Sequence, residues 1–143
     1  MAADAWVLYN TGKLKIHDGT FTLGSDTLKT ALVLSTYTPA TTHTTWASIS
    51  SNEHANGNGY TTGGVTVAGT VTQSTGTVTF DVADPQWTAS GGSIVFRYAV
   101  LYNSTTGDLI GYTLTDNSPA DVTVTDTNVL TLQINASGVY QAA

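Results

Sequence analysis

The chain has 143 residues, of which 10% are charged, and ten acidic against four basic residues give a formal net charge of −6. Nucleic acids and anionic membranes are normally bound through clustered cations, so this balance excludes both as expected partners. The length predicts one domain over residues 1–143, and the absence of cysteine excludes disulfides and thiolate-bound metals.

The N-terminal part of the chain has weak patterns and one clear strand. Ala5–Tyr9 is apolar but too short for periodicity to distinguish a strand from one helical turn. Asn10–Gly12 predicts a turn, and Lys13–Ile16 predicts a second short strand. Asp26–Ser35 alternates leucines with threonine, lysine and alanine and predicts a strand, which the Pro39 region ends.

The segment Ala40–Gly64 is predicted to be one long irregular loop, with a short helical turn at Trp46–Ile49. Its glycine-rich end lacks the Gly-Lys-Ser/Thr sequence of a phosphate-binding loop and precedes a strand, so we expect a backbone with several positive φ angles instead. Long loops in compact domains are usually functional. We therefore expect the partner-contacting residues here, together with the two termini. The residues expected at this interface are Trp46, Asn56, Gly59, Tyr60, Gly63 and Gly64.

The middle of the chain predicts a hairpin followed by a central strand. Val65–Thr72 and Thr77–Val82 alternate apolar and polar residues around a Gln-Ser-Thr-Gly turn, and Asp84–Trp87 predicts a further turn. Ser93–Tyr102 is β-branched and aromatic with no internal glycine or proline. Because both of its faces are mostly apolar, we expect this strand in the middle of a sheet that is covered on both sides.

Short strands continue to the C-terminus. Asp108–Thr115 predicts the second strand of a hairpin with the central strand, and Asp121–Thr125, Val129–Ile134 and Gly138–Tyr140 predict the last pairings. About eight short strands with frequent turns are typical of an all-β fold. We therefore predict an antiparallel β-sandwich or barrel with one long irregular loop.

Arg97 is a cation within the predicted central strand, between Val95 and Ala99. A buried cation requires a carboxylate partner. We predict a structural ion pair with Asp81 or Asp84 from the preceding hairpin, and Glu53 is the third candidate.

No residue pattern predicts catalysis, a cofactor or a metal. The three histidines lie too far apart in sequence for a zinc motif, and aspartates spaced by five residues do not match an EF-hand loop. Serine, threonine, histidine and carboxylates are present, but no Gly-x-Ser-x-Gly elbow places a nucleophile. We therefore expect a protein that is not an enzyme and binds no cofactor.

Three blocks carry a resemblance to a known family. The first runs from Ser25 to Pro39, the second from Gly57 to Val65, and the third from Ala83 to Tyr112. Together they resemble small structural proteins of tailed bacteriophages, over residues 5–140, and Gly-Tyr-Thr-x-Gly-Gly is the most specific part. The N-terminal stretch departs from that family's pattern, in which an amphipathic helix is usual.

The resemblance implies a capsid decoration (cement) protein that is made in the bacterial cytoplasm and binds the exterior of the virion head. Its implied partners are the major capsid protein and further copies of itself, with a trimer as one hypothesis. A tail, neck or fibre component is the alternative within the same class. A second alternative is a carbohydrate-binding β-sandwich that uses exposed aromatic rings of Trp46, Tyr60 or Trp87.

Overall fold

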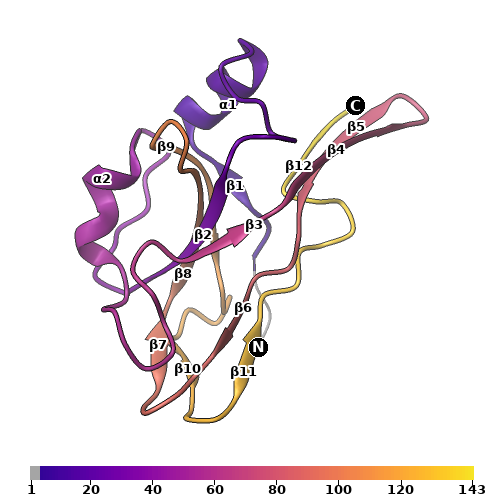
Figure 1. Ribbon diagram of the computed structural model, residues 1–143. Coiled ribbons are helices and arrows are strands. Elements are labelled where there is room, and N and C mark those ends of the chain that lie inside the picture. Colours follow the sequence, from indigo (N-terminus) through magenta and orange to yellow (C-terminus); the bar gives the residue numbers. More distant parts are fainter. Residues whose placement is uncertain (1–3) are drawn as a thin grey trace.

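The computed structural model describes residues 4–143, which form a β-rich molecule with two short α-helices (Figure 1). A five-stranded antiparallel sheet lies at its centre, with β8 in the middle position. The strands in spatial order are β1 (Val7–Leu8), β9 (Asp108–Leu114), β8 (Tyr98–Asn103), β2 (Leu28–Val33) and β3 (Val65–Val67).

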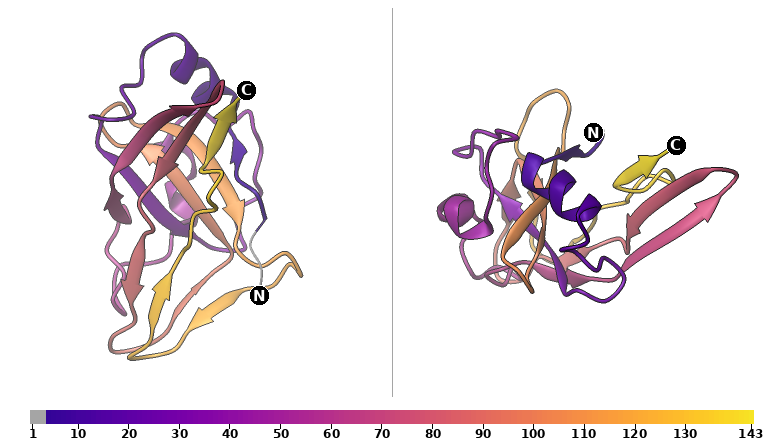
Figure 2. Two further views of the ribbon diagram at one scale, coloured as in Figure 1. Left: turned by 90° about the vertical axis from the view of Figure 1, so that its right-hand side faces the viewer. Right: turned by 90° about the horizontal axis from the view of Figure 1, so that it is seen from above.

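Three smaller antiparallel sheets form a second β layer beside the central sheet (Figure 2). They pair β4 (Gly69–Ser74) with β5 (Thr77–Val82) and β5 with β12 (Tyr140–Ala142), β6 (Gln86–Thr88) with β11 (Val129–Thr131), and β7 (Ile94–Phe96) with β10 (Val122–Val124). Only Ala68 separates β3 from β4, so the chain passes from one layer to the other at this residue. The predicted all-β, sandwich-like fold is confirmed.

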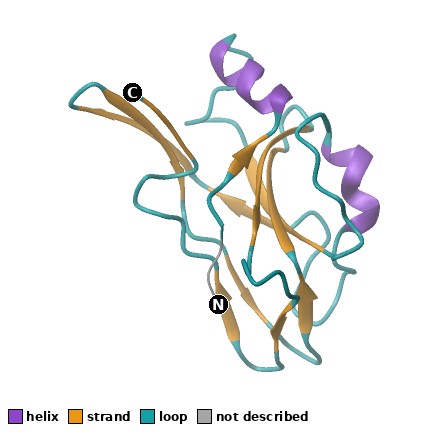
Figure 3. Cartoon of the chain, turned by 180° about the vertical axis from the view of Figure 1, so that it is seen from behind, coloured by secondary structure: helices purple, strands orange, loops and turns teal. Residues whose placement is uncertain are grey.

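Neither helix belongs to the second β layer: α1 (Asn10–His17) lies at one end of the molecule and α2 (Trp46–Ile49) lies beside the central sheet (Figure 3). Helix α1 packs against β9. Helix α2 and the 3₁₀ turn η1 (Ser50–Asn52) belong to the long loop and cover the outer face of the sheet. The predicted helical turn at Trp46–Ile49 is confirmed.

The core surrounds both faces of β8. Ala99 and Leu101 face the second β layer, whereas Val100 and Tyr102 face the long loop, and all four side chains are buried. Two apolar clusters fill the space between the β layers, and a third lies under α2 around Ile49. The prediction of a mid-sheet strand covered on both sides is therefore confirmed for this segment.

The predictions of a turn at Asn10–Gly12 and of a strand over Lys13–Ile16 are wrong, because both stretches belong to α1. Gly12 explains how the helix fits. A Cβ atom at this position would lie 2.6 Å from the carbonyl oxygen of Ile110, so only glycine lets the helix lie this close to β9. An eight-residue helix is unstable alone, and packing against the sheet therefore decides its conformation.

The predicted strand Ser93–Tyr102 is divided in two at Arg97, where the chain bends. The Arg97 backbone N–H donates to the carbonyl of Val33, and its carbonyl accepts from the N–H and hydroxyl of Thr115. These bonds hold the bend at the point where the chain leaves one sheet for another. Strands that change sheets through a bend are a known way of making corners between β layers.

Two further predictions differ from the structure and one agrees. The predicted strand Val65–Thr72 is divided into β3 and β4, and the predicted turn Asp84–Trp87 contains the start of β6. These divisions give twelve short strands within residues 4–143 instead of about eight. The β4–β5 hairpin agrees with the prediction, and its two-residue loop, Thr75–Gly76, has positive φ at both positions.

Candidate docking surface

Glu53 fixes the glycine-rich end of the long loop onto the central sheet. Its carboxylate accepts hydrogen bonds from the Tyr60 hydroxyl at 2.7 Å and from the Gly63 N–H at 2.5 Å. The Tyr60 hydroxyl in turn accepts from the backbone N–H of Leu32, and the Tyr102 hydroxyl donates to the Gly63 carbonyl at 2.7 Å. The loop is thereby bonded to both β2 and β8.

The two tyrosine hydroxyls remain protonated at ordinary pH. Burial raises the pKa of Tyr60, and its hydrogen bond to Glu53 raises that pKa further. Burial and the nearby negative charge of Glu53 raise the pKa of Tyr102 to about 12. Because both groups must carry a proton to donate, the bonds that hold the loop persist through the physiological pH range.

The backbone of this loop has the positive φ angles that its sequence predicts. Gly57, Asn58, Gly59, Gly63 and Gly64 all have φ between 53° and 126°. At Gly64 a Cβ atom would lie 2.0 Å from the carbonyl oxygen of Thr30, so the chain also passes too close to β2 for any side chain. The loop is consequently a preformed surface rather than a segment that orders on binding.

The six residues predicted to form the interface do not share one environment. Asn56 and Gly59 are exposed, whereas Gly63 and Gly64 are half-buried against the sheet. Trp46 is half-buried and stacks on Tyr102, with ring centroids 4.6 Å apart and planes 6° apart. Tyr60 is only 2% exposed, so its predicted place at an interface is wrong: its ring lies in the core and its hydroxyl holds the loop.

A second accessible feature is the arm formed by β4, β5 and β12, which projects from the body of the molecule (Figures 1 and 2). The residues from Thr70 to Ser74 are exposed on both faces of the strand. No charged residue occurs between Ala55 and Phe80, a stretch that includes the loop end and most of the arm. The sequence predicts no interface residue on β4, but the absence of charge across this run distinguishes it from the rest of the chain.

The predicted partner of Arg97 is wrong. Its guanidinium pairs with Asp121, with Nε 2.9 Å from Oδ1, and neither Asp81 nor Asp84 takes part. Asp81 instead accepts a hydrogen bond from the N–H of Val82, and Asp84 accepts from that of Ile134. The bend at Arg97 directs its side chain toward the segment that precedes β10, where both charges remain partly exposed.

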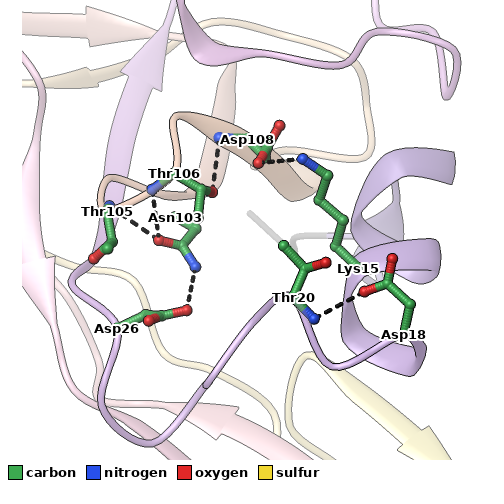
Figure 4. Close-up of polar contacts among 8 residues, drawn as sticks. All are labelled: Lys15, Asp18, Thr20, Asp26, Asn103, Thr105, Thr106 and Asp108. Atoms are coloured by element: carbon green, nitrogen blue, oxygen red, sulfur yellow. Dashed lines mark hydrogen bonds and ion pairs between the residues drawn. The ribbon is translucent and has the colours of Figure 1, made fainter.

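A separate polar cluster joins α1 to the turn between β8 and β9 (Figure 4). The buried Asn103 side chain donates to Asp26 at 2.6 Å and accepts from the N–H groups of Thr105 and Thr106. Lys15 of α1 forms an ion pair with Asp108 at 2.6 Å, and Asp18 accepts from the N–H of Thr20 at 2.8 Å. These bonds satisfy the polar groups of the tight turn and attach α1 to it. The cluster therefore has a structural role.

An open groove of about 810 Å³ lies where the N-terminal segment meets the chain between β11 and β12. Trp6 and Tyr140 contribute aromatic surface, and Asp84 and Asn135 contribute polar atoms. Its wall is mixed in polarity, and its lining includes no cation. This arrangement would disfavour an anionic ligand.

The aromatic rings expected for a carbohydrate platform are mostly inaccessible. Trp87 is 3% exposed and Tyr60 is 2% exposed, and the third ring, Trp46, has one face against Tyr102. A sugar stacks on an exposed ring face, which neither buried ring offers. The three residues therefore do not form the platform that this alternative requires.

Residues 4–143 contain no group of three or more histidine, aspartate and glutamate side chains arranged to hold a metal ion. In the same part of the chain, no helix has the length and apolar character needed to cross a bilayer. Comparison of the chain with protein-family models, with curated proteins and with solved structures gives no match.

Proposed function

We propose that this chain is a non-enzymatic structural protein of a tailed-bacteriophage virion and that it decorates the outer surface of the capsid. The three sequence blocks from Ser25 to Tyr112 support the assignment to this class of protein. The proposal concerns a protein that docks onto other protein surfaces, and the observation that carries it is the uncharged stretch of sequence from Ala55 to Phe80.

This stretch has the physical properties that docking requires. Its loop part is preformed, since Glu53, Tyr60 and Tyr102 hold it against the sheet, so little conformational entropy is lost on binding. Its lack of charge avoids the cost of desolvating ions at an interface. It also allows several copies of a chain with net charge −6 to approach a common surface through their least repulsive parts.

The proposal is tested by cosedimentation with heads of a phage that carries this chain, produced without it. We expect the wild-type chain to bind these heads saturably. Thr61→Arg adds charge to the exposed loop without removing a bond of Glu53, and we expect it to weaken binding at least tenfold, by roughly 1.4 kcal/mol or more. Thr123→Arg changes another exposed threonine, on β10, and should bind as the wild type does.

The result that contradicts the proposal is an absence of cosedimentation at any concentration, or equal binding by both variants. Electron microscopy of labelled particles distinguishes the head from the tail, neck or fibre alternative. Label at the tail would replace the decoration proposal with that alternative.

A further inference from the structure

β4 differs from every other strand that ends a sheet within residues 4–143. It has six residues, whereas the remaining edge strands, which are β1, β3, β6, β7, β10, β11 and β12, have two or three. An edge strand presents unpaired N–H and C=O groups that can pair with another chain, and proteins commonly limit this hazard by keeping edge strands short. β4 is therefore the edge at which such pairing is least restricted.

β4 also lacks the other features that normally protect an edge. Gly69–Ser74 contains no charged residue and no proline, and its ladder with β5 runs through six consecutive pairs without a bulge. The residues from Thr70 to Ser74 are exposed, and no helix or loop covers the strand at these positions. The edge is thus long, regular and open in the described part of the chain.

The pairing pattern shows which backbone groups of β4 are free. The Ala83 N–H donates to the Ala68 carbonyl at 2.9 Å, so these two residues form a hydrogen-bonded pair of the β4–β5 ladder. Pairs alternate along an antiparallel ladder, so Thr70 and Thr72 also bond toward β5. The N–H and C=O groups of Val71 and Gln73 consequently point away from β5, toward solvent.

The same strand carries the most exposed apolar side chain of the arm. Val71 is 51% exposed, and Val78, on the same face of the neighbouring strand, is 39% exposed. Phe80, which lies directly opposite Val71 on β5, belongs to the same face and is buried in the core. The apolar face therefore extends from the buried Phe80 across to the exposed Val71, which lies beside the free backbone edge.

We propose that β4 pairs antiparallel with β4 of a second copy of this chain, around a two-fold axis that places Val71 opposite Val71. In this register the free backbone groups of Val71 bond to each other, and Thr70 lies opposite Thr72. The register shifted by two residues would place Val71 opposite Gln73. The first register is preferred because it brings the two exposed valines together and removes both from water.

The distribution of charge favours a second copy of the chain as the partner that pairs with β4. Two chains with net charge −6 repel each other, and an approach through any acidic part of the body increases that repulsion. The arm projects from the body, and its residues from Gly69 to Phe80 are uncharged, so two arms meet at the least cost. An antiparallel pair of identical strands is self-complementary, which is the requirement for a closed two-fold dimer.

A pair of six-residue strands covers less area than a standard interface of about 1,200–2,000 Å², so the dimer forms reversibly and depends on protein concentration. The inference does not rest on the proposed place in a virion. Dimerisation through β4 leaves the loop around Asn56 free, and either property can fail while the other holds.

The absence of natural cysteine allows a direct test by disulfide formation. In the proposed register, Val71→Cys brings two Cα atoms to about 5.5 Å, the separation that a disulfide requires. Gln73→Cys lies on the same strand face, but its two copies are separated by four residues of strand, about 14 Å. We expect the Val71→Cys chain to form a covalent dimer under mild oxidation, and the Gln73→Cys chain to remain monomeric on a denaturing gel.

Analytical ultracentrifugation supplies a second readout on the full chain. We expect the wild type to approach twice the 14.9 kDa monomer mass as concentration rises. Val71→Lys places two like charges opposite each other and should remain a monomer, whereas Gln141→Lys, on β12 at the opposite edge of the same sheet, should dimerise as the wild type does. A monomeric wild type, equal crosslinking of both cysteine variants, or dimerisation of Val71→Lys would each overturn the proposal.

Discussion

Gly64→Ala is the substitution that most directly tests how the loop is held against the sheet. Gly64 has φ of +77°, and a left-handed conformation costs a non-glycine residue about 1–2 kcal/mol. The added Cβ atom would also lie 2.0 Å from the carbonyl oxygen of Thr30 and 2.7 Å from the Cα atom of Ala31. Both atoms belong to the backbone of buried β2, so the loop or the strand has to move.

The two costs are of different origin and add. Overpacking of this kind costs about 1–3 kcal/mol, so the free energy of unfolding should fall by about 2–5 kcal/mol in total. Equilibrium unfolding in urea, followed by tryptophan fluorescence to which the buried Trp87 contributes, measures this change. A loss of this size is a large fraction of the stability of a small domain.

Gly76→Ala is the matched control. Gly76 has φ of +85°, but no atom lies within 4 Å of the position that its Cβ would occupy. This variant should lose only the conformational part, about 1–2 kcal/mol. If the two variants lost the same free energy within error, the close approach of the loop to β2 would be refuted.

Three further predictions concern stability. Thr30 is fully buried, and its hydroxyl has no hydrogen-bond partner among the described residues, so Thr30→Val should raise the free energy of unfolding by about 1 kcal/mol. Thr113→Val is the control: it loses a hydrogen bond to the Asp4 carbonyl and should lower the free energy of unfolding by about 1 kcal/mol in the same urea assay. Arg97→Ala should change the free energy of unfolding by less than about 1 kcal/mol, because its ion pair is partly exposed; a larger loss would contradict this account. Burial raises the pKa values of Tyr9 and Tyr60 above the ordinary 10, so their contribution is complete below pH 10 and falls by about 1.4 kcal/mol per pH unit for each tyrosine above it. Unfolding measured from pH 8 to pH 11.5 should show this decline with a shallower slope in Tyr60→Phe, and parallel slopes would contradict the assignment.

Features with a local cause could be predicted from the sequence. The alternation of Thr77–Val82 and the turn residues before it are sufficient to predict one strand of a hairpin, and β5 spans the same residues in the structure. The glycines near Tyr60 predict positive φ angles, because no other residue adopts them without cost. The apolar faces of Ser93–Tyr102 also predict the central position of β8.

The candidate site was predicted only in part. Asn56 and Gly59 are accessible as expected, but a tyrosine in a loop has the same local pattern whether its ring faces solvent or the core. The hydroxyl of the buried Tyr60 is bonded to Glu53 of the same loop and to Leu32 of β2, and the contact with β2 depends on how the loop packs. Whether β4 can pair with another chain likewise depends on its position at the edge of a sheet. That position cannot be predicted from the residues of β4 alone.

The sequence by itself determined the all-β class, the hairpin geometry, the glycine-dependent loop and the charge-free run from Ala55 to Phe80, because each follows from residues close together in the chain. Only the tertiary structure decided that Lys13–Ile16 is helical, that the chain bends at Arg97, and that Asp121 is the partner of that arginine. Each of these depends on which layer a segment packs against. Such long-range contacts override weak local preference wherever the local signal is small.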